Sequence, residues 1–284
     1  SKGEGLGNQF LATIRECDAI AYVLRCFEND DITHVEGRID PIADLETVET
    51  ELMLADLESL EKRVSNLENR AKSGDKESKA TLDMVLRAKT LLEAGTPARH
   101  VKRTAEEEKT FHMLQLLTSL PVLYVCNVDE SAAVGGNAHT ARVAERATAE
   151  NAALTIICAQ LEAEIAALSD EEQAEFLETV GLQEPGLTKL IHAGYDLLGL
   201  QTYFTVGPKE ARAWTIHKGD TAPQAAGVIH TDFEKGFIRA EVIGYADFVA
   251  YNGEQGSKEA GKMRLEGKDY IVKDGDVMHF RFNA

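Results

Sequence analysis

Three polar residues and one valine follow an apolar run: positions 127–130 read Asn127-Val128-Asp129-Glu130. The run before them has the composition of a buried strand, and ligands of α/β proteins bind at the carboxyl ends of such strands. An asparagine there can read the N7 edge of a purine, and a carboxylate nearby can accept hydrogen bonds from exocyclic amino groups. An ordinary polar turn explains the same residues, and spacing alone favours that alternative.

Two glycine-containing segments resemble phosphate-binding loops superficially. Residues 256–262 satisfy G-x-x-x-x-G-K, but Met263 follows where a Ser or Thr hydroxyl must reach Mg²⁺, so we interpret the match as accidental. Gly3, Gly5 and Gly7 have no strand before them in this sequence. A flexible loop explains these glycines without any bound phosphate. We expect this loop to lead into a helix with Phe10, Leu11 and Ile14 on one face.

Histidine and cysteine show no pattern of a metal centre. The four cysteines form no C-x-x-C pair, and three of them lie in or beside apolar runs, where a thiol acts as a small hydrophobic group. This usage predicts a reducing, cytoplasmic setting without disulfides or zinc. No metal-ligand spacing is present among six histidines: His100, His112, His139, His192, His217 and His279.

Continuous short apolar runs predict a parallel sheet. The runs at 19–24, 120–126 and 154–158 are expected to be strands buried on both faces. A helical pattern covers 140–151, and Ser169–Glu172 has the form of a capping box that opens another helix. Alternating strands and helices predict an α/β fold with helices on the faces of the sheet.

A stripe of leucine and valine separates the first two predicted strands. Its members recur at gaps of mostly three and four: Leu45, Val48, Leu52, Leu57, Leu60, Val64 and Leu67. Ser73-Gly74-Asp75 interrupts the stripe, and a second one follows as far as Leu91. Two long antiparallel helices inserted into the sheet are therefore predicted. We expect the stripe to pack within this hairpin, with a dimer seam as the alternative.

Charge is distributed unevenly along the chain. The formal net charge is −18, but residues 201–284 contain 11 Lys/Arg and 12 Asp/Glu, so nearly all of the excess lies in the first 200 residues. The break predicts a separate C-terminal domain of short alternating segments, among them Val228–His230 and Tyr270–Val272. The acidity argues against DNA as a partner except through a local patch. No apolar stretch approaches the roughly 18 residues of a membrane span.

Several motifs together resemble one family. The opening residues 1–11 resemble the switch II tail of Obg-related P-loop NTPases, with Gly3, Gly5 and Gly7 in that tail. Cys26-Phe27-Glu28-Asn29-Asp30, the helical insertion and Asn127-x-x-Glu130 look like the YchF/Obg-like ATPase family. Residues 219–231 and 273–276 resemble a TGS domain, which implies a β-grasp fold. The resemblance covers the whole chain and implies four parts: a nucleotide-binding segment (1–42), a helical-hairpin insertion (43–118), the rest of a partial Rossmann-like P-loop sheet (119–199) and a TGS domain (200–284).

One departure from the family concerns phosphate binding. The family's Walker A loop, its Mg²⁺-binding hydroxyl, switch I and the Asp-x-x-Gly element would precede Ser1, and this sequence contains none of them. Either the chain is a fragment of a longer ATPase, or it lacks phosphate-binding machinery; a start inside a switch favours the fragment. On this interpretation Mg²⁺ acts with ATP in the parent protein, and the chain alone needs no cofactor and binds nucleotide poorly.

The resemblance also implies roles for individual residues. Glu130 stands where related GTPases have the Asp of Asn-Lys-x-Asp, which accepts N1–H and N2–H₂ of guanine, and Val128 replaces the Lys that covers the base. Both changes weaken the grip on guanine, in line with the family's preference for ATP. Cys158-Ala159-Gln160 occupies the base-edge loop that supplies backbone donors. His34 is expected to position the attacking water, although from sequence alone it reads as a solvated loop residue.

The combined expectation is a cytoplasmic, nucleotide-dependent switch. It would bind and hydrolyse ATP, and less specifically GTP, and engage the ribosome or RNA. The alternative is a non-catalytic adaptor whose helical arm and β-grasp domain bind the ribosome or a protein without turnover.

Overall fold

The computed structural model describes residues 2–29 and 37–283. The chain divides into two compact units, Ser1–Gly194 and Tyr195–Ala284, and each has a hydrophobic core of its own. None of the described helices is long and apolar enough to cross a bilayer.

A three-stranded parallel sheet forms the centre of the first unit, in the order β1 (Ile20–Arg25), β2 (Val122–Asn127), β3 (Ala153–Ile157). The register pairs Ile20 with Val122 and Leu123 with Ala153, so the three strands end at the same edge. The central strand is buried along almost its whole length, which is why its sequence is continuously apolar instead of alternating. The three predicted strands are therefore present, but burial on both faces is found only in β2, since β1 alternates and its Val23 is 67% exposed.

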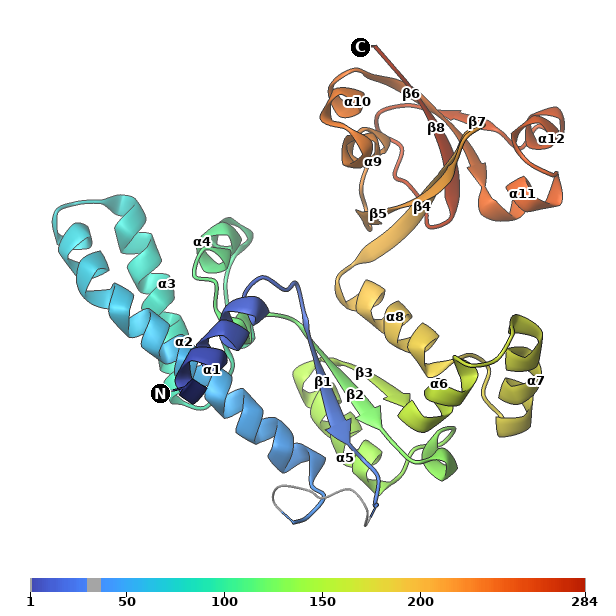
Figure 1. Ribbon diagram of the computed structural model, residues 1–284. Helices are drawn as coiled ribbons and strands as arrows, with labels where there is room; N and C mark the ends of the chain where they lie inside the picture. Colours follow the sequence, from blue (N-terminus) through green and yellow to red (C-terminus); the bar gives the residue numbers. More distant parts are fainter. Residues whose placement is uncertain (1, 30–36, 284) are drawn as a thin grey trace. The chain divides into compact units, whose positions relative to one another are not determined.

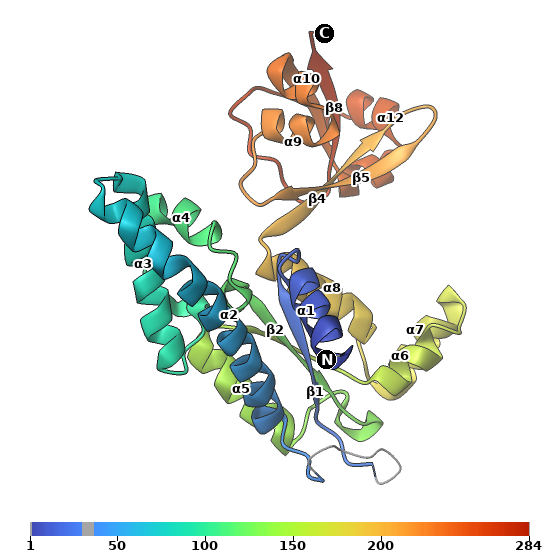
Figure 2. The ribbon, with the colours of Figure 1, turned by 60° about the vertical axis from the view of Figure 1, so that its left-hand side comes forward.

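The segment between β1 and β2 forms the predicted hairpin of α2 (Pro41–Lys72) and α3 (Lys76–Glu93), which lie side by side in both views (Figures 1 and 2). Asp40 caps α2 through the Ala43 amide, and Pro41 occupies the first turn, where its missing N–H costs nothing. Leu57, Leu60, Val64 and Leu67 of the stripe pack within the hairpin, as expected. Leu45 and Leu52 instead pack against the sheet, and Val48 is 49% exposed.

The two halves of α2 pack against different partners. Leu45 and Leu52, in its first half, belong to the core of the sheet. Leu60, in its second half, packs with Val85 of α3 and with Phe111 from the segment that returns to β2. We call the second half of α2, together with α3 and the segment up to Leu116, the arm. One unbroken helix of 32 residues therefore joins the sheet to the arm.

The amino-terminal segment differs from the expectation of a glycine-rich loop. Residues 2–14 form a helix, α1 (Lys2–Ile14), so Gly3, Gly5 and Gly7 lie inside it. Leu11 and Ile14 pack against the core of the sheet, whereas Phe10 is 65% exposed. Burial of this apolar face compensates for the helix-weakening glycines, each of which costs about 0.5–1 kcal/mol relative to alanine.

The other helices of this part of the chain lie before β2 or after β2 and β3. The predicted helix at 140–151 is α5 (Ala138–Glu150), which packs Val143 and Ala147 into the same core as Leu45 and Leu52 of α2. The predicted capping box at Ser169 is present and opens α7. The remaining helices are α4 (Glu108–His112), α6 (Ala159–Ile165), α7 (Asp170–Val180) and α8 (Gly186–Leu197).

The second unit is a five-stranded mixed sheet in the order β5-β4-β8-β6-β7. Its strands are β4 (Leu200–Val206), β5 (Ala211–His217), β6 (Phe237–Gly244), β7 (Arg264–Glu266) and β8 (Asp276–Phe282). The first and last strands, β4 and β8, are parallel neighbours in the middle, while β4–β5 and β6–β8 are antiparallel. Together with a helix that packs on this sheet between the second and third strands, this is the topology of a β-grasp fold.

Two predictions in this unit were wrong. Val228 and Ile229 end a helix, α9 (Ala222–Ile229), and a second helix, α10 (Thr231–Lys235), follows His230 at once. The signal of the first helix was the capping box of Thr221 and Gln224 with a proline in its first turn. Residues 270–272 form no strand and make a single bridge to Thr221 through Ile271. The other helices are α11 (Tyr245–Ala250) and α12 (Glu254–Glu259).

Candidate functional site

The carboxyl ends of β2 and β3 are joined by the side chain of Asn127, the last residue of β2. Its Oδ1 accepts a hydrogen bond from the backbone N–H of Ala159 at 3.0 Å. The backbone around it is equally constrained, because the Asn127 carbonyl accepts from Cys26 N–H at 2.8 Å and Val128 N–H donates to Ile157 O at 2.9 Å. The loops after three strands are thus held together at one edge of the sheet.

The next turn presents Glu130 toward the loop that follows β3. Glu130 Oε1 accepts a hydrogen bond from Gln160 Nε2 at 3.0 Å, and both side chains are exposed. Cys158 lies below them, 4% exposed, as the residue that precedes α6. The structure therefore brings Asn127, Glu130 and the residues 158–160 together at the carboxyl ends of β2 and β3.

Asp129 shapes this turn and does not point into the site as a free acid. Its carboxylate accepts hydrogen bonds from the Ser131 hydroxyl at 2.5 Å and from the Ala132 amide at 3.2 Å. The Ser131 hydroxyl and then the backbone amides hold the pKa of Asp129 below its usual range. The charged form of Asp129 thus fixes the 3₁₀ turn that begins at Glu130.

Val128 has a structural role that its position in the motif did not reveal. Its side chain is 3% exposed and belongs to the core beneath the sheet. It does not cover a ligand from the outside, as the lysine of Asn-Lys-x-Asp would. A lysine at this position would have to bury its ammonium group or disturb the turn.

Asn137 also holds this edge of the sheet together, and the sequence analysis did not single it out. Its Nδ2 donates to the carbonyl of Cys26, just beyond β1, at 2.6 Å, and its Oδ1 caps α5 through the amides of His139 and Thr140. The signal was present, since Asn137 and Thr140 form a capping box. Through this residue the end of β1 is tied to the start of α5.

A group of four buried or half-buried charges, which we call the charge network, lies between the arm and the sheet. Arg99 pairs with Glu49 of α2 and with Glu150 of α5, the latter at 3.1 Å, and Arg146 of α5 pairs with both carboxylates. Tyr124 of β2 donates its hydroxyl to Glu150 Oε2 at 2.7 Å. Two cations and two anions balance, as burial of charge requires.

The charge network changes the pKa of one of its members, Glu150, and of a neighbouring side chain, Tyr22 of β1. Burial raises the pKa of Glu150, but the hydrogen bond from Tyr124 and the charges of Arg146 and Arg99 outweigh it, so the pKa lies below its usual range. Burial and, next, the Glu49 carboxylate raise the pKa of Tyr22 to about 12. Because Tyr124 precedes Asn127 by three residues on the same strand, the charge network connects α2 to the strand that ends in the candidate site.

The remaining sequence-predicted positions lie elsewhere. His34 falls outside the described residues. The G-x-x-x-x-G-K match is no phosphate loop, because Gly256–Glu259 lies within α12, and a side chain at Gly256 would collide with the carbonyl of Tyr251. Gly256 is therefore required for packing of α12 against the end of α11.

Comparison with known proteins agrees with this architecture. Residues 200–283 match the family model YchF-GTPase_C, described as a protein of unknown function (DUF933). The chain is 58% identical over its full length to the "Ribosome-binding ATPase YchF" of Haemophilus influenzae, and 53% identical to that of Bacillus subtilis; it covers 78% of each relative. The solved structure of the Schizosaccharomyces pombe YchF GTPase superimposes with a TM-score of 0.82 at 34% identity, over 96% of this chain and 75% of that one.

A parallel sheet interrupted by a helical hairpin and followed by a β-grasp unit places the chain among the Obg-related nucleotide-binding proteins. Within that class, the chain belongs to the YchF family.

Proposed function

We propose that this chain supplies base recognition and ribosome engagement in a cytoplasmic, ATP-hydrolysing switch protein. The observation that carries the proposal is the hydrogen bond from the Gln160 amide to Glu130, beside the bond that joins Asn127 to Ala159. A carboxylate already engaged by an amide donor is less available to the N1–H and N2–H₂ of guanine. The names of the bacterial relatives, which call them ATPases, support the same choice of base.

Phosphate binding requires groups that the sequence does not contain. No G-x-x-x-x-G-K-[ST] motif occurs in the 284 residues, and backbone amides and the lysine of such a loop supply most of the grip on phosphates. The hydroxyl that would bind Mg²⁺ belongs to the same motif, so Mg²⁺ would arrive with ATP and be held outside this chain. Titration of the chain with a fluorescent ATP analogue should show no saturable binding below about 1 mM; tight binding would contradict this division of roles.

Base choice is tested in an extended chain, defined as this chain preceded by the phosphate-binding segment of the H. influenzae relative. Glu130→Asp shortens the side chain by one methylene and so restores the Asp of Asn-Lys-x-Asp. The shorter carboxylate should no longer reach the amide of Gln160. We expect the affinity for GTP relative to ATP to rise by about 1–3 kcal/mol. Val128 is left unchanged because it is buried. Glu164→Asp, an exposed carboxylate on the same helix as Gln160, is the control, and an unchanged nucleotide preference in Glu130→Asp would show that discrimination lies elsewhere.

Ribosome engagement must overcome the negative charge of the first 200 residues. A groove on the arm is lined by Lys62, Arg63 and Arg70, of which Lys62 pairs with Glu58 and Arg70 with Asp75. Arg63 is the cation of this groove that we assign to the ribosome contact. Cosedimentation of the extended chain with ribosomes should weaken in Arg63→Glu and not in Lys79→Glu, an exposed lysine on α3 outside this groove. Ribosome binding without any ATP hydrolysis by the extended chain would instead support the adaptor.

A further inference from the structure

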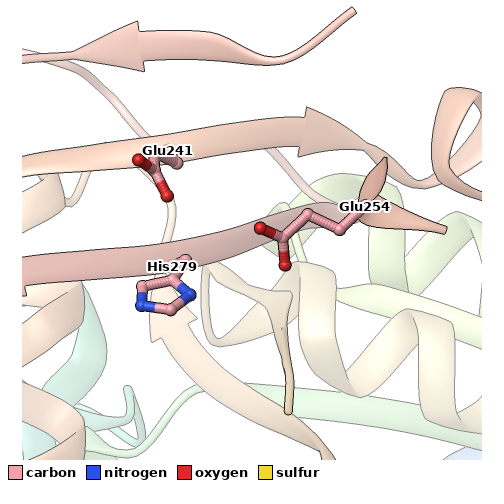
Figure 3. A group of neighbouring side chains, drawn as sticks. All are labelled: Glu241, Glu254 and His279. Atoms are coloured by element: carbon pink, nitrogen blue, oxygen red, sulfur yellow. The ribbon is translucent and has the colours of Figure 1, made fainter. Parts of the chain in front are cut away.

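Three side chains that can bind a metal ion come together in the second unit, far from the base-edge residues in sequence. Glu241 lies on β6, His279 on β8 and Glu254 at the first position of α12. One ligand atom of each lies within 4.8 Å of the other two, and Figure 3 shows the three side chains gathered on one side of the sheet. Their separation of 13 to 38 residues explains why no motif announced them.

The sheet and α12 fix the positions of these residues. Glu241 and His279 are direct cross-strand partners, so their side chains share one face and lie close together. Ala240 and Val242, on either side of Glu241, are fully buried in the core on the opposite face. Glu254 is held because α12 packs tightly, as shown by the buried Ser257 and its hydrogen bond to the Asp247 carbonyl at 3.3 Å.

A small cavity lies where the three side chains meet. The cavity has a volume of about 10 Å³, measured as the space open to the centre of a water-sized sphere. This is enough for one water molecule or one ion. Glu241, Glu254 and His279 border it, and its other walls include Phe248 and Met278. Glu254 and His279 are themselves exposed, so a cation can reach this position from solvent.

The donor set selects a class of metal. One imidazole nitrogen with two carboxylate oxygens suits Zn²⁺ and neighbouring ions such as Co²⁺ and Ni²⁺, whereas Mg²⁺ and Ca²⁺ prefer oxygen alone. Bonds of 2.0–2.1 Å in a tetrahedron place ligand atoms about 3.3 Å apart. The three groups must therefore approach one another by about 1.5 Å at most, which side-chain rotations can supply.

Arg281 is placed to support such a site. Its Nη2 donates to Glu241 Oε2 at 3.1 Å, which orients the carboxylate and leaves the other oxygen free of this contact. Donors in this outer position typically tune metal affinity by about 10–100-fold. The arginine also offsets one of the two negative charges, so the site favours a cation without holding two uncompensated carboxylates.

We propose that Glu241, Glu254 and His279 bind one divalent cation of the Zn²⁺ type, with water at the fourth position. The ion fastens α12 to the sheet strands β6 and β8. It stabilises the C-terminal unit and takes no part in nucleotide chemistry.

The test uses the nucleotide-free chain without an affinity tag, in a Cys17→Ser background because Cys17 is an exposed thiol. Calorimetric titration with ZnCl₂ should give one equivalent, and the thermal midpoint of the chain should rise with Zn²⁺. His279→Gln and Glu254→Gln should each weaken binding at least about tenfold. Both residues are exposed, so these variants are expected to fold, as circular dichroism can verify.

His217→Gln is the matched control, since His217 is an exposed histidine on β5 of the same unit; its affinity should equal that of the parent. Co²⁺ provides a second readout, because its visible spectrum reports coordination by nitrogen and oxygen and should disappear in His279→Gln. Absence of saturable Zn²⁺ binding would overturn the proposal. Equal affinity in His279→Gln and the control would do the same.

Discussion

Asp56 offers the sharpest test of how the arm is attached to the sheet. This residue of α2 is fully buried. Its carboxylate accepts three hydrogen bonds from the segment that leads into β2: Leu117 N–H to Oδ1 at 2.8 Å, Thr118 N–H to Oδ2 at 2.8 Å, and the Thr118 hydroxyl to Oδ2 at 2.7 Å. Asp56→Asn keeps the shape of the side chain but replaces one of its two acceptor oxygens with a donor.

The expected cost follows from the donors left without an acceptor. Whichever way the amide is turned, its NH₂ group faces a backbone N–H, so at least one buried donor loses its partner at about 1–3 kcal/mol. Relief from burying a charge offsets part of this cost. We expect a net destabilisation of about 2 kcal/mol at this junction, and more for Asp56→Ala, which leaves all three donors without a partner.

Hydrogen exchange at Leu117 and Thr118 measures this effect locally, which matters because a chain of two units need not unfold in one step. A loss of about 2 kcal/mol corresponds to roughly thirtyfold faster exchange. Burial raises the pKa of Asp56, so its contribution is largest at low pH and declines as the pH rises through that pKa; the difference from Asp56→Asn should shrink in the same direction.

The control for Asp56 is Glu58→Gln, a carboxylate 69% exposed that pairs with Lys62 on the same helix. Exposed pairs contribute little, so exchange at Leu117 and Thr118 should remain unchanged. If Asp56→Asn also exchanged at the parent rate, the three hydrogen bonds would not hold the junction, and the reasoning would be refuted.

Three other variants test separate parts of the chain. His34→Ala in the extended chain should slow single-turnover ATP hydrolysis about tenfold or more without changing the affinity for a non-hydrolysable analogue; parent-like turnover would remove His34 from catalysis. Glu150→Gln should remove stability that the parent has above about pH 4.5 and loses as the pH falls through the lowered pKa of Glu150, so acid titrations of the two proteins should converge. Gly256→Ala should destabilise the C-terminal unit by about 1–3 kcal/mol in urea through its collision with Tyr251. Gly267→Ala, which has open space around it, should not, and equal stability of the two would contradict the packing argument.

Elements that depend on local pattern could be predicted from the sequence. A parallel strand buried on both faces is apolar throughout, as β2 is, and a hairpin core repeats every three or four residues, as α2 does. Local pattern failed where distant packing decides the outcome. Gly3, Gly5 and Gly7 favour a loop on their own, yet Leu11 and Ile14 hold that segment against the core as a helix.

The candidate site divides in the same way. Asn127 and Glu130 could be singled out because they follow a recognisable strand, and the loop at 158–160 because it follows the next one. The partners of the charge network could not, since Glu49 and Arg99 are 50 residues apart and each reads as an ordinary surface charge. The cluster around His279 was hidden for the same reason, because only the strand register places Glu241 beside it.

The continuity of α2 makes this helix a lever. Its 32 residues span about 48 Å at 1.5 Å per residue. The N-terminal half of α2 packs on the sheet and contributes Glu49 to the charge network, and its C-terminal end lies at the tip of the arm. A tilt of only about 5° at the N-terminal end of α2 would move the tip by roughly 4 Å over this length. A small rearrangement at the strand ends can leave the fold of the sheet unchanged. Through α2 it would still displace the tip of the arm by about the distance between two atoms in contact.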